Sequence, residues 1–188
     1  QANTAMFLAG GLLAKNVSHT IAAVARAIAG ARSLVAIECG ATGPTKDCGY
    51  ENPIVKSIAS VPICAEGKNA TCAHADLIGN LTAGVCDVWS NESVYNREEM
   101  GGPTPGVWLQ SLGYECALMN TATQIGVAKQ LRDTYVLADK YRDPQGVILS
   151  YDNAYLIGQA ITQEGEDIYL RARAAALKAM DCINEAVD

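Results

Sequence analysis

The sequence predicts an α/β protein in which one strand–helix–strand unit is followed by a largely helical remainder. The apolar run at 34–37 (LVAI) is typical of a strand that is covered on both faces. Asn52 followed by Pro53 is typical of a helix start, and the segment at 61–66 fits a second strand. No further strand is indicated in residues 71–188, which we expect to be mostly helical.

The segment before the first strand is predicted to be helical. Residues 1–16 contain apolar side chains interrupted by two glycines, each of which weakens a helix by about 1 kcal/mol relative to alanine. Ser18 is expected to cap a clearer helix and Gly30 to close it. We expect Arg26 to point away from the apolar stripe of that helix. The stripe has the spacing i, i+3, i+4, i+7 and consists of Ile21, Val24, Ala25 and Ile28.

The predicted strands and the helix between them form a βαβ unit with parallel strands. Both strands lead into polar loops at one edge, 39–51 after the first strand and 66–74 after the second. That edge is where α/β proteins place their chemistry. Two parallel strands do not form a stable sheet by themselves. Either partner strands come from another chain, or the two strands end a barrel whose earlier strands are missing from this sequence.

The remainder is predicted to contain five helices. Asp143 followed by Pro144 is expected to cap and open the fourth of them, which extends through Leu156. The apolar periodicity places these helices at about 77–88, from 107, at 127–141, from 143, and at 166–186.

The length, the net charge and the longest apolar stretch of the chain argue against several classes of protein. A length of 188 residues suggests one domain or part of a larger one. A net charge of −6 argues against nucleic-acid binding, which needs a basic patch. The longest apolar stretch, 20–31, is interrupted by Arg26 and is shorter than the roughly 20 residues that span a bilayer. The chain opens with Gln1 rather than Met, so we expect it to begin partway through a longer protein.

The cysteines favour a cytoplasmic protein. There are seven of them, an odd number, and none forms a CxxC pair, which indicates reduced thiols. Four N-x-S/T sequons would fit a secreted glycoprotein, but such matches are common by chance and the one at Asn80 lies inside a helical pattern. The sequons begin at Asn16, Asn69, Asn80 and Asn91.

The loop after the first predicted strand carries a candidate metal ligand. Cys48 lies there two residues after Lys46, a cation that would favour the thiolate form, and thiolates bind zinc. Spacing alone more often predicts an ordinary loop thiol. Cys39, near the strand end, is expected to be a bystander thiol. The remaining cysteines are expected to be buried small hydrophobic residues, namely Cys64, Cys72, Cys86, Cys116 and Cys182.

Four polar residues follow the second predicted strand. They could orient metal ligands, accept a proton or contact a partner protein. They could equally cap the next helix and pair with one another, and none is assigned a catalytic role. The four are Glu66, Lys68, His74 and Asp76.

Several motifs in the chain resemble one enzyme family. They are QANTAMF, SLVAIE, GPTKDCGYEN, EGKNATCAHAD, WSNES, ALMNTA, YRDPQ, YDNAY and IYLRA, and together they cover nearly all 188 residues. At these motifs the chain is similar to the zinc-dependent methanol:corrinoid methyltransferase subunits. The resemblance implies a (β/α)8 barrel with additional helices and a homodimer that binds a separate corrinoid protein. The implied reaction transfers the methyl group of methanol to cobalt(I).

The resemblance also assigns the metal. Zinc in that family is held by one glutamate and two cysteines, with methanol as the fourth ligand, and Cys48 is the one counterpart in this sequence. The other ligands are expected upstream of Gln1. Residues 1–188 are therefore expected to be the C-terminal portion of a single barrel domain, with its last two parallel strands and the helices that follow. Such a part is expected to be inactive by itself.

The chemistry agrees with that assignment. Hydroxide is a poor leaving group, so methanol needs a Lewis acid on its oxygen, and Zn²⁺ with three protein ligands keeps a fourth position open for it. One alternative is a methyltransferase for another methylated or methoxylated donor. The other is a non-catalytic assembly module made from the end of a barrel.

Overall fold

The computed structural model of the chain describes residues 8, 11–41, 50–60, 68, 76–86 and 105–187. The elements assigned within these ranges are helices, and no strand occurs in the part of the chain described. The elements are α2 (His19–Glu38), α3 (Asn52–Ala59), α5 (Gly79–Leu81), the π-helix η1 (Thr82–Cys86), α7 (Pro105–Gln124), α8 (Ala128–Lys140), α9 (Pro144–Leu149), α10 (Tyr151–Gln163) and α11 (Ile168–Glu185).

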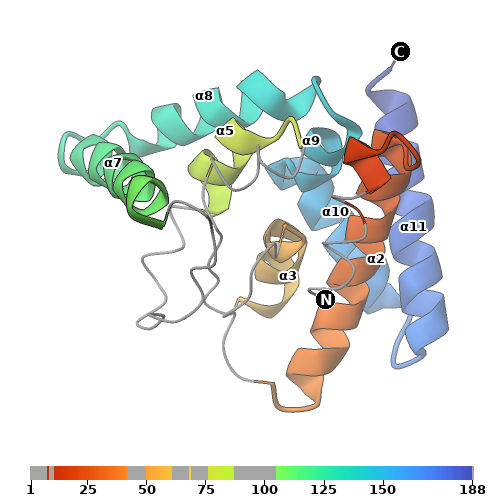
Figure 1. The fold of residues 1–188 in the computed structure, drawn as a ribbon. Helices are drawn as coiled ribbons and strands as arrows, with labels where there is room; N and C mark the ends of the chain where they lie inside the picture. The colour runs from red at the N-terminus through yellow and green to blue at the C-terminus, as the bar shows by residue number, and fades with distance from the viewer. Residues whose placement is uncertain are drawn as a thin grey trace.

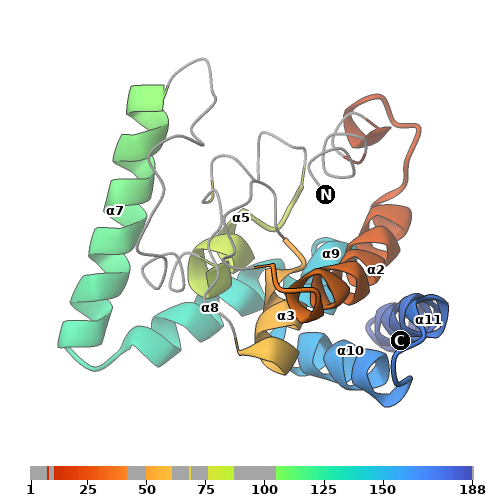
Figure 2. The ribbon, with the colours of Figure 1, turned by 90° about the horizontal axis from the view of Figure 1, so that it is seen from below.

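The helices form one packed group and an arm. In the group, α2 packs against α11, α9 and α3, and α10 packs against α11 and α3 (Figure 1). In the arm, α8 extends from the group and contacts α5, η1 and α7. Figure 2 shows α7 on the opposite side of the molecule from α11. The packed group contains the main hydrophobic core.

Helix α2 has a defined cap at each end. The side chain of Ser18 accepts a hydrogen bond from the Ile21 amide at 3.2 Å, which confirms the predicted N-cap. At the other end, Gly40 has a φ of +89°, the left-handed conformation that glycine adopts most easily. The Ala41 amide donates to the Ala36 carbonyl at 2.9 Å, so the helix ends in a Schellman motif after Glu38.

The predicted strand at 34–37 is wrong, because these residues form the last turns of α2. Gly30 does not close the helix as predicted. It lies inside α2, and a Cβ at this position would lie 3.0 Å from Cγ2 of Ile54. The missing Cβ therefore lets Ile54 of α3 pack closely against α2. With no helix end at residue 30, the apolar run continues the helix.

The face that α2 buries also differs from the predicted one. Ile21 and Ile28 are 59% and 38% exposed, whereas Arg26 is only 3% exposed. The buried face consists mainly of small residues, which let neighbouring helices approach closely. Its members are Ala22, Ala23, Arg26, Ala27, Ala29, Gly30, Ala31, Ser33 and Leu34.

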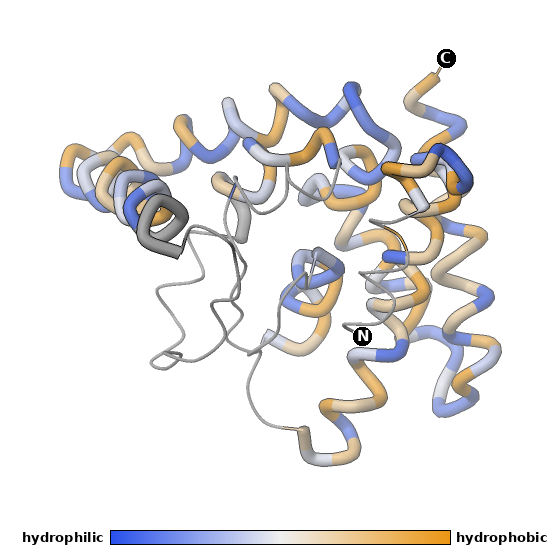
Figure 3. The backbone as a smooth tube through the Cα atoms, viewed as in Figure 1, coloured by the Kyte–Doolittle hydropathy of each residue, from blue (hydrophilic) through white to orange (hydrophobic). Residues whose placement is uncertain are grey.

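By length and composition, α2 could cross a membrane, contrary to the expectation that no apolar stretch reaches this length. Hydrophobic residues recur along the whole helix (Figure 3). Half of the most apolar window is buried inside the protein, and core helices of globular proteins pass the same test. Its contacts with α3, α9 and α11 identify α2 as such a core helix.

The second half of the predicted βαβ unit is tested only in part. A helix does begin at Asn52, but the N-cap position is Glu51 rather than Asn52, and Pro53 lies in the first turn as expected. The predicted strand at 61–66 lies outside the described residues. The α/β prediction is therefore wrong at 34–37 and untested at the second strand.

The helices predicted after residue 76 are confirmed with two changes. The predicted helix at 77–88 begins as the short α5 and continues as the π-helix η1 as far as Cys86. The predicted fourth helix is divided at Ser150, whose extended conformation (φ −62°, ψ 150°) separates α9 from α10. Asp143 caps α9 as predicted and accepts a hydrogen bond from the Gln145 amide at 2.8 Å.

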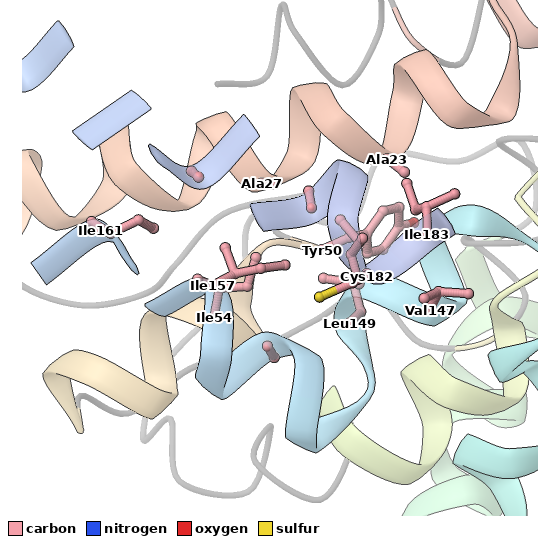
Figure 4. Packing of buried hydrophobic residues seen from close by; sticks show 14 of the residues in the cluster. Ala23, Ala27, Tyr50, Ile54, Val147, Leu149, Ile157, Ile161, Cys182 and Ile183 are labelled. Atoms are coloured by element: carbon pink, nitrogen blue, oxygen red, sulfur yellow. The ribbon is translucent and has the colours of Figure 1, made fainter. Parts of the chain in front are cut away.

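The main core lies between α2, α3, α9, α10 and α11, and it continues through Ile78, Leu81 of α5 and Val136 of α8. Figure 4 shows Tyr50 from the segment before α3 among these side chains, together with Cys182 of α11. Leu8 and Leu12 form a smaller cluster with Ala22 on another side of α2. The labelled members of the main core are Ala23, Ala27, Tyr50, Ile54, Val147, Leu149, Ile157, Ile161, Cys182 and Ile183.

Candidate functional site

The predicted metal ligand, Cys48, lies outside the described residues, as do Lys46, Glu66 and His74. Within the described part of the chain, no group of three or more His, Cys, Asp or Glu side chains is placed to hold a metal ion. The structure does describe the chain from Tyr50 onward, starting with the second residue after Cys48. It also describes Lys68 and Asp76 of the second polar segment.

The chain is firmly held from the second residue after Cys48. Tyr50 is 1% exposed, and Glu51 and Asn52 are also buried. Ser33 on α2 donates a hydrogen bond from its Oγ to Oε1 of Glu51 at 2.9 Å. A buried carboxylate needs such partners because desolvation penalises its charge. The segment that enters α3 is therefore tied to α2.

Arg26 makes the second tie between α2 and this segment. Its guanidinium carbon lies 4.5 Å from the centre of the Tyr50 ring. Its Nη2 donates to Oδ2 of Asp76 at 2.9 Å, and its Nε donates to Oε1 of Gln145. Gln145 completes the arrangement by donating from Nε2 to Oδ1 of Asp76 at 2.7 Å. We call Arg26, Asp76 and Gln145 the Arg26 triad, and all three side chains are buried.

Asp143 extends the Arg26 triad toward the surface. Its Oδ2 lies 2.7 Å from Nδ1 of His19, a side chain that is partly exposed. The same oxygen accepts the Leu77 amide at 3.3 Å and Nε2 of Gln145 at 3.4 Å. One buried carboxylate thus connects the first turn of α2, the start of α9 and the chain just before α5.

For the polar residues of the second segment, the structure shows pairing where it describes them. Asp76 is held in the Arg26 triad. The Lys68 amide donates to Oε2 of Glu115 on α7 at 3.3 Å, and its ammonium lies 4.0 Å from Oε1 of the same residue. The ammonium also lies 5.6 Å from the centre of the Tyr135 ring. Both residues therefore act in packing the segments together.

The described cysteines differ in their surroundings. Cys39 is exposed at the C-terminal end of α2, and Cys116 on α7 is half-buried. Cys182 is buried as predicted, and burial raises the pKa of its thiol. The side chain of Cys86 is not described, and Cys64 and Cys72 lie outside the described residues.

The sequence of the whole chain matches one known family. The sequence model of the methanol-cobalamin methyltransferase B subunit (MtaB) matches residues 1–188. The chain belongs to this family. A relative from Methanosarcina barkeri (strain Fusaro / DSM 804), named methanol–corrinoid protein co-methyltransferase, is 57% identical over 185 residues. That match covers 98% of this chain and 40% of the relative.

A solved structure supports the same relationship. The crystal structure of the methanol:cobalamin methyltransferase complex MtaBC from Methanosarcina barkeri contains a chain similar to this one, with a TM-score of 0.81 and 57% identity. The match covers 100% of this chain and 41% of that chain. This member of the B-subunit family therefore spans about 40% of the length of the relatives it matches.

Sequence reasoning missed the buried polar residues of this B-subunit family member. Arg26 was expected to point away from the apolar stripe, but it faces the interior with Asp76 and Gln145. One signal was available, because an arginine in the middle of an otherwise apolar helix requires either solvent or a buried partner. The partners could not be named, since they follow Arg26 by 50 and 119 residues.

Proposed function

We propose that the intact protein transfers the methyl group of methanol to the cobalt(I) of a corrinoid carried by a partner protein. The observation that carries this proposal is 57% identity over 98% of the chain to a relative named methanol–corrinoid protein co-methyltransferase. The solved MtaBC complex supports it, because a chain of that complex resembles all of this one. The KDCGYEN motif, which contains Cys48, lies within the matched region.

We propose further that Cys48 is one of the ligands of a zinc ion, with the other ligands coming from residues outside 1–188. The donor chemistry fits, because a thiolate is a preferred zinc ligand and lowers the net charge of the ion. Bound zinc would supply Lewis-acid polarisation of the methanol oxygen, which weakens its bond to the methyl carbon. One thiolate cannot hold the ion against water, so additional protein ligands are required.

The contribution of the described residues is to hold the chain next to Cys48. Tyr50 and Glu51 are buried and tied to α2 through Arg26 and Ser33. A metal ligand must stand within a few tenths of an ångström of its ideal position, and it does so only on a rigid support. These contacts fix the chain from Tyr50 onward, which is the described part of the chain nearest to Cys48.

The test compares two cysteine variants of the intact protein. Zinc content is measured by elemental analysis, and methyl transfer from methanol is followed by the absorbance of a cob(I)amide partner protein. We expect Cys48→Ser to lose zinc and methyl transfer together. Cys39→Ser, which changes an exposed thiol at the end of α2, is the control and should retain both. Full zinc content and undiminished turnover in Cys48→Ser would overturn the metal assignment.

The same experiment separates the alternatives. Methyl transfer from a methoxylated donor but not from methanol would identify the protein as a related methyltransferase with another substrate. A protein that binds the corrinoid partner but transfers no methyl group from either donor would be an assembly module.

We also propose that the described helices belong to a (β/α)8 barrel with additional helices, to which residues 1–188 contribute the C-terminal portion. The proposed protein is cytoplasmic and forms a homodimer that binds the corrinoid protein. A crystal structure of the intact protein tests the barrel. Light scattering with and without the corrinoid partner tests the homodimer.

A further inference from the structure

Helix α11 carries apolar side chains on two opposite faces. Its inner face packs against α2, α9 and α10 and consists of Arg171, Ala175, Ala179, Cys182 and Ile183. The helix lies at the edge of the packed group, so its outer face is exposed (Figure 1). A surface helix normally has one apolar stripe toward the core and a polar face toward water. Apolar residues on the outer face of α11 therefore indicate a second contact surface.

The outer face has the spacing of a helix–helix contact. Its exposed residues recur at alternating intervals of three and four, which keeps them on one line along the helix. Three of them are large and apolar, with exposed fractions of 39%, 46% and 48% for Leu170, Leu177 and Met180. Alanines border this line at 174 and 176, so a second helix can come close. We call the line the α11 seam, and it consists of Leu170, Arg173, Leu177, Met180 and Asn184.

The charged residues of α11 are ordered along the helix. The cations Arg171, Arg173 and Lys178 precede the carboxylates of Asp181 and Glu185. The helix dipole favours the opposite order, with carboxylates in the first turn and cations in the last, so the order does not stabilise α11 itself. In an antiparallel pair of α11 helices, the basic part of one faces the acidic part of the other. The outer face is therefore self-complementary across a two-fold axis, the commonest symmetry of homo-oligomers.

One antiparallel register satisfies both the seam and the charges. It places Leu177 of each copy against Met180 of the other, on either side of the two-fold axis. Arg173 then lies level with Asn184 of the second copy and within one turn of its Asp181, a distance that an arginine side chain spans. Among the described residues, neither Arg173 nor Asp181 makes an ion pair. Both charges are thus available to a second copy.

We propose that the α11 seam is the surface through which two copies of the protein associate, with their α11 helices antiparallel across a two-fold axis. The inference rests on the homodimer of the proposed function and names the surface that forms it. A surface that binds its own copy must be complementary to itself, and the seam meets this condition in both its apolar residues and its charges.

The first test introduces a charge at the centre of the seam. Leu177→Glu places two carboxylates beside the two-fold axis and removes two buried leucines from the dimer. The control is Leu118→Glu on α7, because Leu118 is 47% exposed and Leu177 is 46% exposed. The dimer dissociation constant of the intact protein is measured by sedimentation equilibrium, after circular dichroism has shown that each variant is folded. We expect Leu177→Glu to raise it at least about a hundredfold, since each buried leucine contributes about tenfold or more, and Leu118→Glu to leave it within about twofold.

The second test reverses the charges that the register brings together. Arg173→Asp and Asp181→Arg each place like charges across the contact, and each should raise the dissociation constant by about fivefold or more. The double variant with both reversals should return it to within about threefold of the wild-type value, because each new aspartate again faces an arginine. The two residues are about two turns apart on one helix, beyond the reach of contacts within one copy, so the rescue must come from the second copy.

The outcomes distinguish this inference from the proposed function. A Leu177→Glu protein that dimerises like the wild type overturns the inference, and so does an equal loss of dimer in both glutamate variants. Unchanged mass with a lower free energy of unfolding would show that the seam packs within one copy, and unchanged mass with lost binding of the corrinoid protein would assign it to that partner; either result overturns the inference. In all these cases methyl transfer from methanol and the zinc content of Cys48→Ser still decide the proposed function. A monomeric wild-type protein overturns the homodimer and this surface together.

Discussion

The close approach of α9 to the end of α8 predicts that Gly146→Ala destabilises the protein. A Cβ at residue 146 would lie 2.5 Å from the carbonyl oxygen of Asp139 and 3.3 Å from Cα of Lys140. Both are backbone atoms, so no side-chain rotation relieves the contact and the helices must separate. Alanine gains about 1 kcal/mol over glycine in a helix, whereas overpacking costs about 1–3 kcal/mol. Since the neighbour is rigid, the upper end of that cost applies and the net loss is about 2 kcal/mol.

Gly113→Ala in α7 is the matched control, because a Cβ there meets no atom within 4 Å. Both variants of the intact protein are unfolded in urea and followed by circular dichroism. Gly146→Ala should lower the free energy of unfolding by about 2 kcal/mol, and Gly113→Ala should raise it by up to about 1 kcal/mol. A Gly146→Ala protein as stable as the wild type would refute the reasoning. It would mean that α9 and the end of α8 leave enough space for the added Cβ.

Three further predictions concern stability. Burial raises the pKa of the Cys182 thiol, so the unfolded state ionises first as the pH rises. The stability advantage of the wild type over Cys182→Ala, measured by urea unfolding, should therefore be constant below about pH 8.5 and shrink above it; a constant advantage at higher pH would contradict this. Asp167→Ala removes the cap of α11, where Oδ1 accepts the Leu170 amide at 2.9 Å, and should cost about 1 kcal/mol, with Asp167→Ser retaining most of the stability. Asp139→Ala removes the oxygen that accepts the buried Leu81 amide at 2.8 Å, and should lower the free energy of unfolding by about 2–3 kcal/mol. Asp139→Asn keeps an oxygen at this position and should cost measurably less.

Features that depend on a few neighbouring residues could be predicted from the sequence. Ser18 and Asp143 cap their helices as expected, because a cap needs only a short polar side chain and the amides two or three residues later. The helix at 34–37 could not be predicted in this way. Its four apolar residues fit a buried strand equally well. The folded structure shows that α2 continues to Glu38, with Gly30 inside the helix and packed against Ile54.

In the candidate site, too, the features set by neighbouring residues could be predicted from the sequence, and those set by distant residues could not. The chemistry of Cys48 and the resemblance that assigns it come from local motifs, and the family membership is confirmed. The burial of Arg26 depends on Asp76 and Gln145, which are brought to it by the fold. The pattern of one helix does not contain that information. An alternative face of α2, with Ile21 and Ile28, was therefore the natural prediction.

The Arg26 triad has a consequence for how the protein is made. Gln145 leaves the ribosome 119 residues after Arg26, which at about 5–20 residues per second is a delay of roughly 6–24 s. During that interval the newly synthesised α2 is a long apolar helix whose central charge has no complete set of partners. Arg26 therefore gains its full set of partners only after Gln145 has been synthesised, and any slowing of translation between residues 38 and 145 lengthens that interval.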